Sequence, residues 1–116
     1  HWVDLLVIHW PSAAMNLPSL LEALADLRER GLARAVGVSN FPPALMRRTL
    51  ELNIAPIACL QVEHQVMLDQ SRLLEITAPR GIVLTSYTPL GKGTGVLDHP
   101  VLREVAARHR ATPAQV

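Results

Sequence analysis

The sequence is poor in the residues that mark several large classes of protein. It has one cysteine, Cys59, so no disulfide can form within the chain. Cys59 lies in an apolar run, which favours a small buried side chain in a reducing, cytoplasmic compartment. The longest apolar run has four or five residues, far below the roughly 20 that a membrane helix needs. No charged leader followed by an apolar stretch opens the chain, and we expect no signal peptide.

Neither sign of charge dominates. Eleven Lys and Arg residues oppose ten Asp and Glu residues, and the basic residues are scattered along the chain. This balance indicates neither a nucleic-acid nor a membrane partner. The five histidines lack the spacing of metal ligands and no cysteine cluster accompanies them, so we expect no metal site. A length of 116 residues falls in the range of one domain.

The most informative stretch is 5–11, Leu-Leu-Val-Ile-His-Trp-Pro. Its continuous apolar run predicts a strand buried on both faces, as in a parallel sheet covered by helices. Pro11 cannot donate to a strand ladder and therefore marks the strand's end. His9 then follows the carboxyl end of the strand, where parallel α/β folds carry their chemistry. The alternative is a histidine ring held by a neighbouring backbone group.

Strand and helix patterns alternate along the rest of the chain. Expected strands cover 5–8, 33–38, 57–62 and 82–86, and expected helices cover about 18–30, 43–52, 70–78 and 98–109. The strands begin about 25 residues apart, which fits one strand–helix unit per repeat. Such units predict a parallel sheet with right-handed crossovers. The side chains expected to face the core are Leu20, Leu24 and Leu27 in the first helix, and Leu45, Thr49 and Leu52 in the second.

Several residues predict where helices begin and end. Pro18 suits a first turn, Gly31 a carboxyl-terminal stop, and Asp98 a cap for the last helix. Pro79 predicts an early end to the third helix. A capping box at 112–115 opens another helix just before residue 116, and a strand opens the chain, so we expect both ends to be cut.

Polar side chains follow each expected strand: His9, then Ser39 and Asn40, then Gln61, then Tyr87. Parallel neighbouring strands would bring all of them to one rim. Amide and hydroxyl groups can pair with a carboxamide, a tyrosine can stack on a flat ring, and a histidine can donate to a carbonyl oxygen. The set suits a nicotinamide beside a carbonyl substrate. In the alternative interpretation, Ser39 or Asn40 caps the next helix, Gln61 satisfies a loop, and Tyr87 packs half-buried.

These strand ends sit in longer motifs. The chain resembles the aldo-keto reductases over essentially its whole length, and the branch that includes the 2,5-diketo-D-gluconate reductases is similar. The matching stretches are 4–11 (DLLVIHWP), 34–41 (RAVGVSNF), 61–63 (QVE), 86–91 (SYTPLG), 98–102 (DHPVL) and 112–116 (TPAQV). The resemblance implies a partial (β/α)8 TIM barrel of about four consecutive units, truncated at both ends.

The resemblance also implies roles for individual residues in binding NADP(H) and a small carbonyl substrate. His9 matches the histidine that orients the carbonyl, and Trp10 would line the substrate pocket. Ser39, Asn40 and Gln61 match the residues that hold the nicotinamide carboxamide, and Tyr87 matches the aromatic that stacks on the ring. The residues beside the pyrophosphate would be Leu90, Gly91 and Lys92. The alternative for the glycine-rich stretch 91–95 is a plain loop.

The resemblance places the family's catalytic aspartate, tyrosine and lysine before residue 1. Tyr87, the only tyrosine, has the stacking motif instead. The chain also departs from the family pattern after Glu63, where His64-Gln65-Val66 alters the loop. We therefore expect an NADP(H)-dependent aldehyde or ketone reductase as the complete protein, with the 116-residue chain inactive alone. The alternative is a non-catalytic cofactor-binding barrel with a sensing or regulatory role.

Overall fold

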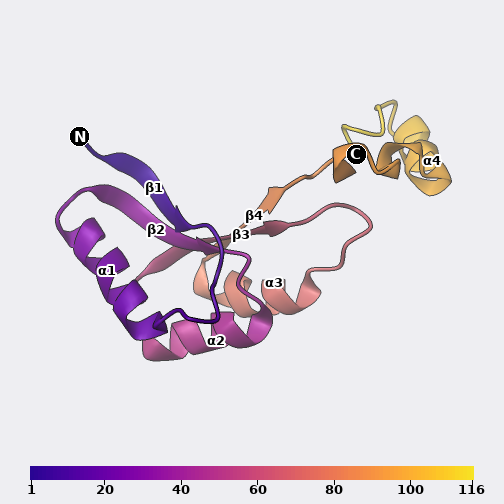
Figure 1. Ribbon diagram of the computed structural model, residues 1–116. Coiled ribbons are helices and arrows are strands. Elements are labelled where there is room, and N and C mark those ends of the chain that lie inside the picture. Colours follow the sequence, from indigo (N-terminus) through magenta and orange to yellow (C-terminus); the bar gives the residue numbers. More distant parts are fainter. The chain divides into compact units, whose positions relative to one another are not determined.

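Strands and helices alternate along residues 1–116, all of which the computed structural model describes (Figure 1). The strands are β1 (Val3–Ile8), β2 (Ala33–Ser39), β3 (Ile57–Glu63) and β4 (Val83–Tyr87). The α-helices are α1 (Leu17–Glu29), α2 (Pro43–Leu52), α3 (Ser71–Thr77) and α4 (Pro100–Arg108). Short 3-10 helices cover Ala78–Arg80, Gly91–Gly93 and Val96–Asp98. The predicted order of elements is confirmed.

The strands form one sheet in the order β1-β2-β3-β4, with β1, β2 and β3 parallel. Val7 lies opposite Gly37, and Ser39 lies opposite Gln61. The register between β2 and β3 shifts at Gly37, where a Cβ atom would stand 2.7 Å from the carbonyl oxygen of Cys59. Only glycine allows the two backbones to approach this closely.

The chain divides into two compact units, residues 1–62 with 70–85, and residues 63–69 with 86–116. In the first unit, α1, α2 and α3 lie on one face of the sheet (Figure 1). The core between these helices and the strands holds fully buried side chains, the largest being Phe41, Leu21, Met46 and Leu60. The predicted layer of helices on a parallel sheet is therefore present.

The buried face of α1 differs from the predicted stripe. Leu17, Leu21 and Leu24 are buried, whereas Leu20 and Leu27 are only partly so. The helix begins at Leu17 because Oδ1 of Asn16 accepts a hydrogen bond from the backbone N–H of Ser19, at 3.2 Å. Leu17, Leu21 and Leu24 are spaced by four and three residues and therefore lie on one side of the helix.

Helix α2 also packs differently from the prediction. Thr49 is buried as expected, but Met46 is fully buried while Leu45 and Leu52 are only partly covered. Thr49 donates a hydrogen bond through Oγ1 to the Leu45 carbonyl oxygen at 2.9 Å, so its hydroxyl is satisfied inside the helix. The unbranched Met46 side chain fills the space between helix and sheet instead.

Helix ends follow the sequence signals in part. Gly31 has φ +69° just after α1, and α3 ends at Thr77, ahead of Pro79, as predicted. Residues 78–80 then form a 3-10 turn. Asp98 is not the cap of α4, because it belongs to the preceding 3-10 turn and its carboxylate pairs with Arg103. His99 is the N-cap residue of α4. None of the helices has both the length and the apolar content needed to span a bilayer.

Strand β1 is more exposed than predicted. Val3 is 49% and Leu5 44% exposed, and only the last three residues of the strand are partly covered. The reason is its place at the edge of the sheet, where it pairs with β2 alone. The expectation of a strand buried on both faces is therefore wrong for this chain. An open edge with apolar side chains is a template for pairing with another strand.

We predict that the 116-residue chain self-associates through this edge. A lysine at position 5 would place a charge on it, so Leu5→Lys is expected to weaken association by about tenfold or more. Sedimentation velocity over a range of concentrations would measure this. Leu74→Lys, which alters an exposed leucine on α3, is the matched control and should leave association unchanged. A monomer at every concentration of the unaltered chain would contradict the prediction.

Candidate active site at the carboxyl ends of the strands

Hydrogen bonds from two adjacent residues join the carboxyl ends of β1, β2 and β3. The side-chain Nδ2 of Asn40 donates to the carbonyl oxygen of His9 at 2.8 Å and to Oγ of Ser39 at 3.0 Å. Ser39 in turn donates through Oγ to the carbonyl oxygen of Gln61 at 2.8 Å. The backbone N–H of Asn40 donates to the same Gln61 oxygen at 2.9 Å. The structure thus brings together four of the predicted site residues.

Asn40 adopts a left-handed backbone conformation with φ +60°. Asparagine is among the few residues other than glycine that tolerate this region. The turn directs its amide back toward β1. Both atoms next to Nδ2 are oxygens that accept hydrogen bonds, so the amide must present its nitrogen, and not its oxygen, to them.

The alternative in which Ser39 or Asn40 caps α2 is wrong. The N-cap residue of α2 is Pro42, and no side chain makes a capping hydrogen bond there. Pro43 occupies the first helical position, where its missing N–H costs nothing. The polar groups of Ser39 and Asn40 are used instead to connect strand ends.

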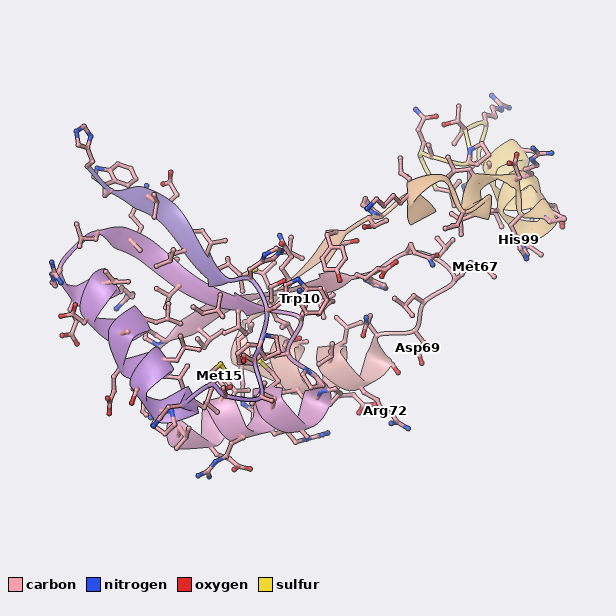
Figure 2. The ribbon with its side chains drawn as sticks, viewed as in Figure 1. Trp10, Met15, Met67, Asp69, Arg72 and His99 are labelled. Carbon is pink, nitrogen blue, oxygen red and sulfur yellow. The ribbon has the colours of Figure 1, made fainter.

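His9 and Trp10 follow β1 on the exposed rim. The His9 ring makes no hydrogen bond within the chain, so the alternative of a ring held by a backbone group is also wrong. Only its backbone carbonyl is held, by Asn40. The two rings lie 6.3 Å apart between centroids, tilted by 57°. Trp10, labelled in Figure 2, is 59% exposed. Both side chains are therefore accessible to a ligand.

Gln61 lies near the end of β3 with its side chain on the face of the sheet opposite the helices. Its neighbours Leu60 and Val62 belong to the helix-covered core, and side chains alternate between faces along a strand. The side chain is half-buried, and its amide makes no hydrogen bond within the chain. Its backbone oxygen, by contrast, accepts two. The backbone is fixed, and the side-chain amide is available to a ligand.

Tyr87 belongs to the second unit and is the last residue of β4. Its carbonyl oxygen accepts hydrogen bonds from the backbone N–H of His64 at 3.4 Å and from Oγ of Ser86 at 3.3 Å. Ser86 also donates to the carbonyl oxygen of His64. The strand end and the loop after β3 are therefore joined through backbone groups, and the Tyr87 side chain is half-buried.

Leu90, Gly91 and Lys92 follow in a tight loop. Gly91 is buried with φ +73°, and a Cβ atom there would stand 2.9 Å from Cβ of Val96. Lys92, at φ +47°, is exposed, and Thr94 N–H closes the turn on the Gly91 carbonyl oxygen at 3.0 Å. A hollow of about 180 Å³ lies beside this loop. No group of three or more metal-ligating side chains occurs in the chain.

Known proteins share this arrangement of strands and helices. The model of the Aldo/keto reductase family matches residues 1–116. The chain belongs to this family. Methylglyoxal reductase DkgB of Salmonella typhimurium is 36% identical over 118 residues, covering 99% of this chain and 44% of the relative. An aldo-keto reductase of Mycobacterium sp. (strain KMS) is 39% identical over 115 residues, covering 98% and 41%.

Solved structures of aldo-keto reductases share the fold. A proposed 2,5-diketo-D-gluconic acid reductase B superposes with a TM-score of 0.90 at 38% identity, over 98% of this chain and 40% of the other. A mutant of Gox0644, solved in complex with NADPH, superposes with a TM-score of 0.86 at 32% identity, over 98% of this chain and 42% of the other. The four-stranded parallel sheet is therefore part of a (β/α)8 barrel, and the chain spans less than half the length of these relatives.

One functional contact was missed by sequence reasoning. The pattern placed Asn40 beside a ligand or a helix, whereas its side chain holds the backbone of His9, thirty-one residues earlier. The available signal was an asparagine between a strand and two prolines, a position that favours a left-handed turn. The pattern could not indicate which carbonyl group the turned amide would reach.

We predict that Asn40 stabilises the folded chain through these bonds. Asn40→Gly keeps the left-handed backbone but removes two hydrogen bonds, and should lower the free energy of unfolding by about 1–3 kcal/mol. Asn40→Ala should lose about 1 kcal/mol more, because alanine disfavours positive φ. Denaturant unfolding of both variants measures the difference. Stability in Asn40→Gly equal to that of the unaltered protein would contradict the role.

Proposed function

We propose that this chain is part of an NADP(H)-dependent reductase of aldehydes and ketones, with His9, Ser39, Asn40, Gln61 and Tyr87 at its active site. The observation that carries the proposal is the hydrogen-bonded rim at the strand ends. An accessible histidine ring follows β1, an unengaged amide lies on β3, and Ser39 and Asn40 at the end of β2 hold the backbone of both. Family membership and the NADPH bound to the Gox0644 mutant support the cofactor.

The residues present fit a nicotinamide cofactor. The side-chain amide of Gln61 offers a hydrogen-bond donor and an acceptor on the face of the sheet opposite the helices. These can pair with the carbonyl oxygen and the NH₂ group of a carboxamide. Asn40 and Ser39 stand beside Gln61 with their positions fixed by backbone groups. We assign these three residues to holding the carboxamide. Bound NADPH would supply a hydride to the carbonyl carbon of the substrate.

His9 has the task of orienting the substrate. Its imidazole N–H would donate to the carbonyl oxygen of the substrate. The hydrogen bond from Asn40 meanwhile fixes the backbone of His9 at the end of β1. Trp10 would form an apolar wall of the substrate pocket next to it. Hydride addition at the carbonyl carbon and transfer of a proton to the carbonyl oxygen would give an alcohol. We assign the proton to the family's tyrosine, which the resemblance places outside residues 1–116.

Residues of the second unit are assigned to the rest of the cofactor. Tyr87 would stack its ring on the nicotinamide, since its backbone is already engaged through the carbonyl oxygen. Leu90, Gly91 and Lys92 would lie beside the pyrophosphate. The exposed lysine supplies a positive charge, and the compact turn lets the backbone come close to a phosphate.

Changing His9 tests the catalytic part of this proposal. In the complete reading frame that carries this chain, His9→Ala is expected to lower kcat/KM for an aldehyde by roughly 10²–10⁴. The NADPH dissociation constant should stay the same, because His9 is not assigned to the cofactor. His109→Ala, which alters an exposed histidine on the second unit, is the matched control. A normal rate in His9→Ala would contradict the role. A protein that binds NADPH but reduces no carbonyl would favour the regulatory alternative.

Changing Gln61 tests the cofactor part separately. Gln61→Leu keeps nearly the same volume and removes an amide that has no partner within the chain. We expect NADPH to bind one to two decades more weakly, from the loss of partners worth about 1–3 kcal/mol. The melting temperature without NADPH should hardly move. Calorimetric titration and thermal unfolding give both values. Unchanged affinity in Gln61→Leu would remove Gln61 from the site.

A further inference from the structure

Three arginines line one hollow at the amino ends of the strands, the end of the sheet opposite the candidate active site. They are Arg28 in the last turn of α1, Arg34 at the start of β2, and Arg80 after α3. The hollow measures about 520 Å³, within the range of small-molecule sites. Apolar side chains, among them Leu50 and Ile82, form part of its wall.

No acidic residue lines this hollow, and neither Arg28 nor Arg80 forms an ion pair. Glu51 and Glu75 lie in the adjoining hollow that Arg80 also lines, outside ion-pair distance. Arg34 is the exception, since its Nη1 lies 3.1 Å from Oδ1 of Asp4 on the exposed surface. Arg34 also lies 5.5 Å from the centre of the Trp2 ring, which limits its freedom. Elsewhere in the first unit, exposed arginines at α1 and α2 do pair with carboxylates.

Two of the three guanidinium groups are held in place. Arg80 donates through Nη1 to the carbonyl oxygen of Ile76 at 2.9 Å, which anchors one edge of its planar group. Arg34 is anchored by Asp4 and Trp2. A planar group with an anchored edge presents its remaining N–H donors in a fixed fork, and that fork matches two oxygens of a phosphate.

We propose that this hollow binds the phosphate group of a small phosphorylated molecule. Arg28, Arg34 and Arg80 supply the charge, and Asn53, exposed in a left-handed turn at the hollow's edge, supplies a neutral polar group. The apolar wall takes the uncharged body of the molecule. This site lies at the opposite end of the first unit from His9 and Gln61, so it is separate from the cofactor site and does not depend on the proposed function.

A structural role for the arginines is the competing explanation. Arg28 and Arg80 stand near helix carboxyl ends, where a positive charge favours the folded state without any ligand. That explanation predicts a loss of stability on substitution and no specific anion binding. The two explanations therefore differ in what a titration shows.

The experiment titrates the complete protein with inorganic pyrophosphate by calorimetry, in the presence of saturating NADPH so that the candidate cofactor site is filled. Arg28→Gln and Arg80→Gln are each expected to weaken binding about tenfold, since each removes one charge-assisted contact. Arg72→Gln is the matched control. It removes an exposed arginine at the first turn of α3 (Figure 2) that does not line the hollow, and should leave binding unchanged.

Several results would overturn the proposal. They are binding that NADPH abolishes, equal losses in all three variants, tighter binding of citrate than of pyrophosphate, or full affinity in both Arg28→Gln and Arg80→Gln. If Arg80→Gln unfolds through loss of its bond to Ile76, Arg28→Gln still decides, because Arg28 makes no hydrogen bond that the fold would lose. Restored affinity in Arg28→Lys would support the charge contribution.

Discussion

The candidate site depends on the way Ser39 and Asn40 connect three strand ends. Parallel strands leave carbonyl groups without partners where the ladder stops, and here His9 and Gln61 each present one. The hydroxyl of Ser39 and the amide of Asn40 satisfy both. Each bond contributes only about 1 kcal/mol. Together they fix the backbone positions of His9 and Gln61 relative to each other, and a binding site needs such fixed backbones to keep its geometry.

The two faces of the sheet have different compositions. Helices α1 to α3 cover one face, and the core between them and the strands holds leucine, valine and phenylalanine side chains that supply the hydrophobic stabilisation. The other face has a glycine at position 37, whose backbone meets the carbonyl group of Cys59. Close approach of β2 and β3 at that point leads directly to the Ser39–Gln61 pairing two residues later. Packing in the middle of the sheet therefore determines the geometry at its rim.

The order and type of the elements could be predicted from the sequence because strand and helix patterns alternate clearly and turn residues separate them. The details that failed depend on contacts between distant residues. Leu17 and Leu21 are buried in α1 in place of Leu20 and Leu27, because packing against the sheet decides which side of the helix is covered. Asp98 pairs with Arg103 instead of capping α4. The exposure of β1 follows from its edge position, which no local pattern encodes.

For the site, residue types and their positions at strand ends were enough to predict that His9, Ser39, Asn40 and Gln61 lie together at one end of the sheet. What the pattern could not indicate is that some of these side chains also hold the backbone. The structure shows this for Ser39 and Asn40. Ser39 is 1% exposed and bonded to backbone, whereas the ring of His9 and the amide of Gln61 make no contact of this kind.

This division has a consequence for substitutions in the first unit. Ser39 and Asn40 couple stability to geometry, so a change at either should alter folding and ligand binding together. The side chains of His9 and Gln61 are assigned to the ligand, while Ser39 and Asn40 hold their backbones. Substitution of His9 or Gln61 can therefore alter binding or rate without altering folding. The arginines at the opposite end of the sheet share no hydrogen bond with these four residues. Because the core separates the two ends, effects of substitutions at the two places should add independently.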